Sequence, residues 1–230
     1  MFLGHYGVAL ALKRKEPTVS LGTLFIACQL VDILWGAFLV LGWEHVRILP
    51  DDNPLLTFQF YDYPITHSLV GALAWSLAAA ALYYSWPTRD TSRHWQATVL
   101  VGAVVASHWV LDLVVHVPDL PIAGNDSPKL GLGLWNHFGL SVAVELLLLA
   151  AGTLVYVRGR SRRHPVRPVR LGTVLLLLVG VYAASLFGPP PPSITAIGLS
   201  DVGFLLLMGL LGAWADRPAA AAELASNPSR

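Results

Sequence analysis

The apolar run at 95–117 most constrains the fold, because it is long enough to cross a lipid bilayer as one helix. Similar runs recur along the chain at 19–43, 65–86, 137–157, 171–187 and 194–215. Hydrophobic residues make up 55% of the 230 residues and charged residues only 13%, about half the charged share of a soluble domain. The sequence therefore predicts an all-α polytopic membrane helical bundle with about six transmembrane helices.

Residues 1–12 are also apolar, but this segment is too short to cross a bilayer upright. We expect a short N-terminal half-helix here, and it carries His5. The basic cluster at 13–15 follows the apolar segment, whereas in a secretory signal peptide the basic residues come first. Because no internal repeat is evident, residues 1–216 are predicted to form a single transmembrane helical domain. The Ala-rich segment 217–230 is predicted to be a disordered cytoplasmic tail.

The positive charges predict the orientation of the helices. Of the 15 Lys and Arg residues, only Arg47 and Lys129 lie outside one alternating set of connecting segments. Because positively charged loops stay in the cytoplasm, this set and the C-terminus are predicted to be cytoplasmic. The turn-rich segments 44–64 and 118–136 are then predicted to face the outer side of the membrane.

Ionisable residues inside the apolar runs gather at one predicted depth. His108, Asp112 and His116 follow one another at i,i+4 spacing, which places them on one broad face of a helix. At a rise of about 1.5 Å per residue, Asp32 reaches a similar depth, at or beyond the midplane. Two histidines, one in the half-helix and one at the start of the run 65–86, approach the same layer. Ionisable groups inside a membrane are costly, so they indicate a functional site.

Three imidazoles and two carboxylates make up the candidate metal site. Its members are His5, Asp32, His67, His108 and Asp112. This mixture of ligands suits Zn²⁺ or another first-row divalent metal, as one ion or as two ions bridged by a carboxylate. Such an ion lowers the pKa of bound water and polarises an ester or phosphoryl oxygen. The simpler interpretation is a buried polar network that pins the helices together.

Several residues near the predicted outer interface are candidate catalytic acids or bases. They are Asp62, His116 and His137. Asp119 is a further candidate, and Glu145 and Asp201 lie in the outer halves of their apolar runs. The distribution of these groups predicts a site that faces the outer leaflet.

The order of these motifs resembles the family of predicted bacterial membrane-bound metal-dependent hydrolases of the LexA-regulated inner-membrane type. The chain has an early His and an Asp in its first long apolar run. Thr-His-Ser then follows at 66–68 and Ser-His-x-x-x-Asp at 107–112. The resemblance covers roughly residues 1–116. It implies a multi-pass protein of the bacterial inner membrane and the set of metal ligands named above.

Two positions depart from the family pattern. Leu34 stands where the family has the second Asp of Pro-Asp-x-Asp, and Asp62 stands where it has the first residue of His-Arg-Gly. Asp62, His45 and His116 are the candidates to replace the missing ligands. These departures indicate a divergent, uncharacterised subgroup.

The sequence thus predicts a membrane-embedded metal-dependent hydrolase acting on an ester or phosphoester, with a lipid among the candidate substrates. One alternative is a transporter or permease-like protein whose buried His and Asp residues relay ions or protons. Another is a homologue that binds metal without catalysis. The expected partner is membrane lipid and not nucleic acid, because the arginine-rich segment 158–170 suits topology and anionic lipid contact. The oligomeric state stays open.

Overall fold

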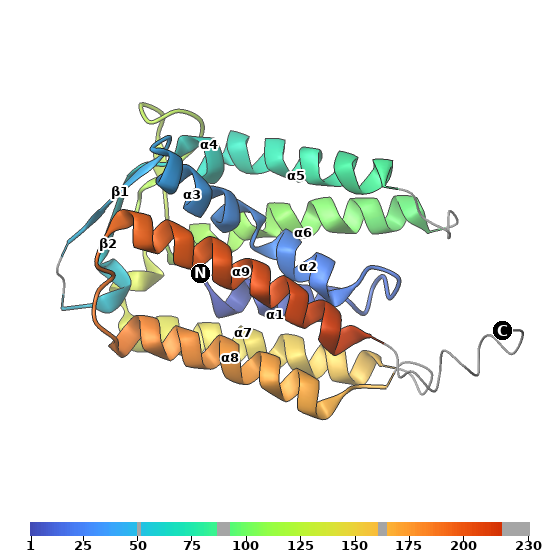
Figure 1. Cartoon of the computed structure of the whole chain (residues 1–230). Coiled ribbons are helices and arrows are strands. Elements are labelled where there is room, and N and C mark those ends of the chain that lie inside the picture. Colours follow the sequence, from blue (N-terminus) through green and yellow to red (C-terminus); the bar gives the residue numbers. More distant parts are fainter. Residues whose placement is uncertain (50–51, 87–92, 161–164, 218–230) are drawn as a thin grey trace, which may run out of the picture.

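The computed structural model describes residues 1–49, 52–86, 93–160 and 165–217, and it is a bundle of helices with two small β-hairpins at one end (Figure 1). The helices are α1 (Leu3–Leu12), α2 (Leu21–Cys28), α3 (Leu30–Leu41), α4 (Pro64–His67), α5 (Leu69–Ser85), α6 (His94–Val115), α7 (Phe138–Gly159), α8 (Pro168–Phe187) and α9 (Ile194–Asp216). The strands are β1 (His45–Ile48), β2 (Phe58–Asp62), β3 (Leu120–Pro121) and β4 (Lys129–Leu130), with 3-10 turns η1 (Pro54–Leu56) and η2 (Leu134–Asn136). The predicted all-α membrane bundle is confirmed. The predicted tail lies, from residue 218 onward, outside the described residues.

The predicted number of spans is only approximate. Four helices, α6 to α9, are long and apolar enough to cross a membrane. Helices α2 and α3 add a fifth span if they are taken together, although the pair is bent by 54°. The predicted second span is divided at Ser68 into α4 and the apolar, 17-residue α5. The protein is therefore a multi-pass membrane protein whose described residues contain four or five candidate spans and shorter apolar helices beside them.

The first predicted span is broken at Gln29. This residue has φ −115° and ψ 9°, which departs from the helical values of about −63° and −42°. The break ends α2 at Cys28 and lets α3 start in a new direction. As a result the Cys28 carbonyl lies at a helix end, where it accepts a hydrogen bond from another helix.

Helix α1 confirms the predicted N-terminal half-helix and is buried inside the bundle. Leu3, Tyr6 and Leu10 are fully buried. Gly7 of α1 crosses Gly152 of α7 so closely that a Cβ on either residue would overlap the backbone of the other helix. The two glycines therefore set how deeply α1 sits in the core, and with it the position of the functional residues that α1 carries.

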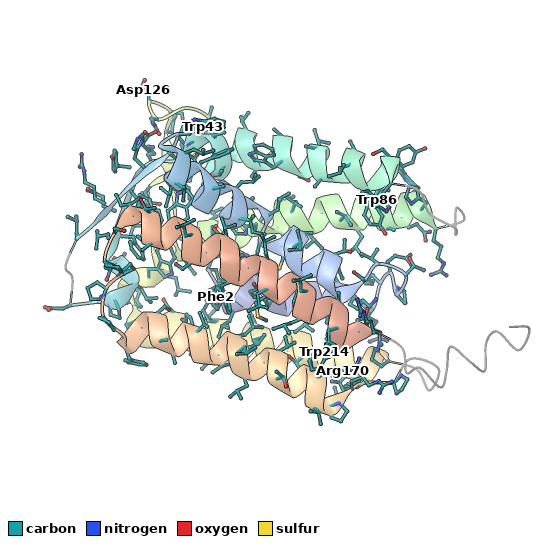
Figure 2. The ribbon with its side chains drawn as sticks, in the orientation of Figure 1. Phe2, Trp43, Trp86, Asp126, Arg170 and Trp214 are labelled. Atoms are coloured by element: carbon teal, nitrogen blue, oxygen red, sulfur yellow. The ribbon has the colours of Figure 1, made fainter. Side chains whose placement is uncertain are left out.

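The described basic residues of the predicted cytoplasmic set gather at one end of the bundle. There Lys13 pairs with Asp216 at 2.7 Å, and Arg160 pairs with the same carboxylate at 3.0 Å. Figure 2 shows Arg170 and Trp214 at this end too. Because Lys13 is almost fully buried, its pairing with Asp216 joins the end of α1 to the end of α9. The side of the membrane that this end faces stays a prediction.

The opposite end is covered by a β-hairpin where the sequence predicted only a polar loop. Strands β1 and β2 are antiparallel, with Val46 opposite Phe60. Val46 packs into a small second core with Trp35 of α3 and Tyr63. The strands form because β-branched Val46 and Ile48 alternate with polar residues in β1, and Phe58 and Phe60 alternate with Gln59 in β2. The hairpin thereby covers the ends of the helices that carry the candidate site (Figure 1).

Replacing Gly152 by Val should separate α1 from α7, because the new side chain would overlap the Gly7 backbone. We expect a loss of about 1–3 kcal/mol in stability, as for other overpacked cores. Thermal unfolding of the purified protein in detergent measures it. Gly139→Val on the same helix is the matched control, since a Cβ at Gly139 meets nothing within 4 Å. Equal melting temperatures for the two variants would contradict the close crossing.

Candidate metal centre

All five predicted metal ligands meet in the half of the bundle nearer the β1–β2 hairpin. Helix α1 brings His5, α3 brings Asp32, α4 ends at His67, and α6 brings His108 and Asp112. Four of the five are almost fully buried, and the Asp32 side chain is 25% exposed. Two groups of three side chains have ligand atoms that all lie within 4.8 Å of one another. Each group contains His108, which makes this residue the centre of the cluster.

The spacing of the ligand atoms agrees with a metal site. Asp32 Oδ1 lies 3.3 Å from His67 Nε2 and 3.5 Å from His108 Nε2. Asp112 lies 2.9 Å from His108 Nε2 and 3.2 Å from His5 Nε2. In a tetrahedral zinc site with metal–ligand distances of 2.0–2.2 Å, neighbouring ligand atoms are about 3.3 Å apart. The side chains are therefore already spaced as ligands of one small cation would be.

The tautomer of His108 is set by the broken span. Its Nδ1 lies 2.8 Å from the carbonyl oxygen of Cys28, and a carbonyl only accepts, so Nδ1 carries the hydrogen. Neutral His108 consequently presents the bare lone pair of Nε2 to the carboxylates of Asp32 and Asp112. Nε2 is buried and has no hydrogen-bond partner of good geometry within the described structure. A lone pair facing two carboxylates is repulsive unless a proton or a metal cation lies between them.

His67 is oriented in the same way by a relay of two further residues. The Thr66 hydroxyl lies 2.6 Å from a carboxylate oxygen of Glu44, to which it donates. The same hydroxyl oxygen lies 2.8 Å from His67 Nδ1 and so accepts its hydrogen. Nε2 of His67 is left to face Asp32 and Asp112. Hydrogen bonds to the second ring nitrogen are how proteins commonly orient metal-binding histidines.

His5 completes the cluster from α1. Its ring stacks on that of His108, with centroids 3.9 Å apart and planes inclined by 4°. Both His5 ring nitrogens are buried without a hydrogen-bond partner among the described residues, although Nε2 is only 3.2 Å from Asp112. His5 Nε2 and Asp112 are close enough for an ion pair, but their angle is not that of a hydrogen bond. Imidazole nitrogens and carboxylate oxygens are ligands that Zn²⁺ takes, so the residues fit the predicted metal.

Glu145 supports the cluster without joining it. From α7, its carboxylate accepts hydrogen bonds from the backbone amides of Phe2 at 2.8 Å and Gly4 at 2.7 Å. It therefore provides hydrogen-bond acceptors for free N–H groups at the start of α1. Its negative charge also interacts favourably with the positive end of the helix dipole. The amino group of Met1 adds an ion pair with Asp112 at 2.6 Å. Together these contacts hold the first turn of α1, and hence His5, against α6.

His116 lies one helical turn beyond Asp112 and is almost fully buried, and its catalytic role stays a prediction. Its Nδ1 is 2.8 Å from Asp119 Oδ1, and the Tyr63 hydroxyl donates to the same oxygen at 2.9 Å. Its ring lies against Trp135, with centroids 4.1 Å apart. His116 lines a cavity of about 550 Å³ that also contains Asp32. Asp119 was only a secondary candidate, and the structure makes it the partner that orients His116.

Asp62 and His137 are not at the site, so their proposed catalytic roles are not supported. Asp62 lies on the β-hairpin, where it contacts His45 at 2.6 Å and accepts from Asn125 at 2.5 Å. Although partial burial opposes the shift, these hydrogen bonds lower the pKa of Asp62. His137 is exposed beside the start of α7. Neither residue lines the cavity. Because Asp62 and His45 pair with each other, they do not replace the ligands that the family pattern has and this chain lacks.

The supporting roles of Glu44, the Cys28 carbonyl and Glu145 are not evident from the sequence. Glu44 follows Trp43 at the end of an apolar run and therefore has the pattern of an interfacial residue. A backbone carbonyl carries no signal in a sequence. The signal that was available is the isolation of Glu145 in the run 137–157, since a lone carboxylate in a membrane needs a partner.

Comparisons with known proteins give weak similarity to membrane receptors. The chain is 30% identical over 183 residues to Mas-related G-protein coupled receptor member E of Homo sapiens. The aligned region covers 71% of this chain and 56% of the receptor. Its counterpart in Macaca fascicularis is 27% identical over 180 residues, with the same coverage. The chain thus spans about half the length of these curated relatives. No protein-family model matches the chain, and no solved structure matches it. The similarity agrees with a multi-pass helical membrane protein.

Replacing Thr66 by Val should weaken metal binding by about 10–100-fold, because His67 loses the hydrogen bond that orients it. Competition titration of Zn²⁺ against a chromophoric chelator measures the affinity. Thr98→Val is the matched control, since the Thr98 hydroxyl is buried without a partner in the described structure. Equal affinities in both variants would show that the Glu44 relay does not support the site.

Proposed function

We propose that the chain is a membrane-embedded, metal-dependent hydrolase that acts on an ester or phosphoester. The observation that carries the proposal is the orientation of His67 and His108. Each ring donates through Nδ1 to an oxygen and directs Nε2 towards Asp32 and Asp112. Once it is unprotonated, each Nε2 can bind a metal ion together with these carboxylates. The resemblance to the bacterial membrane-bound hydrolases, carried by the same residues, supports this proposal and an inner-membrane location.

The expected ligands of one or two divalent ions, with Zn²⁺ the best match, are His5, Asp32, His67, His108 and Asp112. A bound ion would supply a Lewis acid and an activated water at neutral pH. The chain itself supplies a cavity of about 550 Å³, which is typical of small-molecule sites. The cavity reaches the hairpin end of the bundle through Phe58 and Trp135. We therefore assign the open side to the outer leaflet, as the distribution of basic residues predicts.

Two residues beside the cluster have the properties of catalytic groups. His116 is held through Nδ1 by Asp119, in the way that a carboxylate orients a general base. Trp35 lines the cavity, and its indole N–H is buried without a partner in the described part of the chain. This N–H is available to donate to a carbonyl or phosphoryl oxygen as charge develops there. We assign proton transfer to His116 and oxyanion stabilisation to Trp35.

The similarity to Mas-related receptors supports a second candidate, a receptor-like protein that binds its ligand in the same cavity. A receptor needs no metal and no hydrolysis, so metal content separates the two proposals. The transporter alternative is less well supported, because the His and Asp side chains gather in one layer. The polar network of Lys13, Arg160 and Asp216 lies at the opposite end of the bundle. Ion relays instead distribute polar groups along a path between both faces.

Purified protein should contain at least one Zn²⁺ or similar ion per chain, and His108→Ala should lose it, because His108 belongs to both ligand groups. Inductively coupled plasma mass spectrometry measures the stoichiometry. His94→Ala is the control, as His94 lies at the other end of α6 and contacts the Tyr84 carbonyl. A wild-type protein without metal that still binds an organic ligand would favour the receptor.

Replacing His116 by Ala should reduce the turnover of a p-nitrophenyl acyl ester by roughly 10²–10⁴-fold, the range for a general acid or base. The metal content should stay at the wild-type level, since His116 lies outside both ligand groups. His45→Ala on the hairpin is the control, because His45 contacts Asp62 and not the cavity. Loss of metal together with turnover would make His116 a ligand and not a proton-transfer residue.

A further inference from the structure

We propose that the site takes its substrate from the membrane, as a lipid whose head group carries an ammonium group and whose chain lies between α8 and α9. This inference rests on the proposed hydrolase and names its substrate class. It follows from three separate features: a lateral opening, an apolar passage and an acidic interior.

The opening lies between two membrane-spanning helices. Val181 and Ser185 of α8 and Ser200 of α9 line the cavity and are exposed to a solvent-sized probe. A cavity wall that is exposed along two spanning helices opens towards the hydrocarbon phase. The site is therefore accessible from within the bilayer and does not depend on entry through the loops alone.

Among the described residues, the hydrogen bond and the cation–π contact that join the two helices directly both lie at the basic end. There Arg170 donates to the Trp214 carbonyl at 2.8 Å, and its guanidinium lies 5.1 Å from the Trp214 ring centroid. Figure 1 shows α8 and α9 diverging from this end towards the connection at 188–193. The cavity occupies the wider part, beside the candidate metal centre. This geometry gives an opening in the outer half of the bilayer.

The passage from the opening to the metal ligands is apolar. Phe2 stands between the helices, with its ring centroid 6.1 Å from Tyr182 of α8 and 6.1 Å from Phe204 of α9 (Figure 2). Leu186 and Ile197 continue the wall. Hydrocarbon packs well against such a surface, whereas a soluble substrate would gain little from it. The occupant of this passage is therefore an acyl chain.

The interior of the cavity selects the head group by charge. Asp32, Asp112, Glu145 and Asp201 line it, while no Lys or Arg side chain is among its described lining residues. Asp112 and Glu145 have partners in α1, but Asp201 has no hydrogen bond or ion pair in the described structure. An unpaired carboxylate within a spanning helix is costly and is stabilised by a cation. A lipid ammonium group complements Asp201, and an acidic head group would be repelled by it.

Photolabelling in nanodiscs tests the lipid site directly. The probes are phosphatidylethanolamine and phosphatidylglycerol that carry the same diazirine-bearing acyl chain. We expect wild-type protein to be labelled on α8 and α9, with phosphatidylethanolamine favoured by about tenfold, as expected for one charge interaction. Asp201→Asn should remove that preference. Equal labelling by both lipids in the wild type, or a preference for phosphatidylglycerol, would overturn the head-group assignment.

Blocking variants test the lateral opening. Ser185→Trp on α8 and Ser200→Trp on α9 fill the mouth from its two sides, so each should reduce labelling by about fivefold or more by occluding the pocket. The matched controls are Ala183→Trp and Gly203→Trp, which lie on the same helices and do not line the cavity. Labelling that is unchanged in the blocking variants, or reduced equally in the controls, would overturn the site.

Metal analysis of the same samples separates this inference from the proposed function. Loss of labelling with full metal content in Ser185→Trp supports the lipid site on an intact metal centre. Wild-type protein that is labelled as expected but contains no metal would refute the hydrolase while retaining the lipid site. Wild-type protein that contains metal but is not labelled between α8 and α9 would refute the lipid site while retaining the metal centre of the proposed hydrolase.

Discussion

The arrangement of the bundle depends on placing two carboxylates and three imidazoles together in the membrane. Each buried ion costs several kcal/mol unless its neighbours compensate for the loss of water. Asp32 and Asp112 come from different helices and share the same histidines, so neither helix can shift without exposing charge to an apolar environment. The cluster is thus both the proposed functional centre and a constraint on how α3 and α6 pack.

The irregular parts of the fold are explained by this cluster. The break at Gln29 provides a free carbonyl for His108, which an uninterrupted helix would hold within its own ladder. The first turn of helix α1 is buried in the bundle, where backbone N–H groups without a partner are unfavourable. Glu145 accepts hydrogen bonds from two of these groups. Gly7 and Gly152 allow the close crossing that places His5 over His108. Each of these features would lower the stability of a bundle without the cluster. Each one also positions a proposed metal ligand.

Much of the fold and the core of the site could be predicted from the sequence. Apolar run length identifies the helices, and the rise per residue places Asp32, His108 and Asp112 at one depth. The break at Gln29 could not be predicted, because its flanking residues are apolar and helix-compatible. The hairpin was missed because the turn-rich residues around 50–54 conceal the strand pattern that follows them. His116 could be located, and its partner Asp119 lies only three residues further along the chain, a local signal that could have separated it from the distant Asp62.

The carboxylates of the cavity fall into two groups, one beside the proposed metal centre and one beside the proposed lipid site. Asp32 and Asp112 face histidine nitrogens, so one bound cation would neutralise both carboxylates. Asp201 lies on α9, outside both ligand groups. A head group held at Asp201 would therefore contact a residue that does not itself bind the ion. In the proposed arrangement α8 and α9 bind the lipid while α1, α3, α4 and α6 carry the ligands, so a substitution in α8 or α9 could change the preferred lipid without removing a metal ligand.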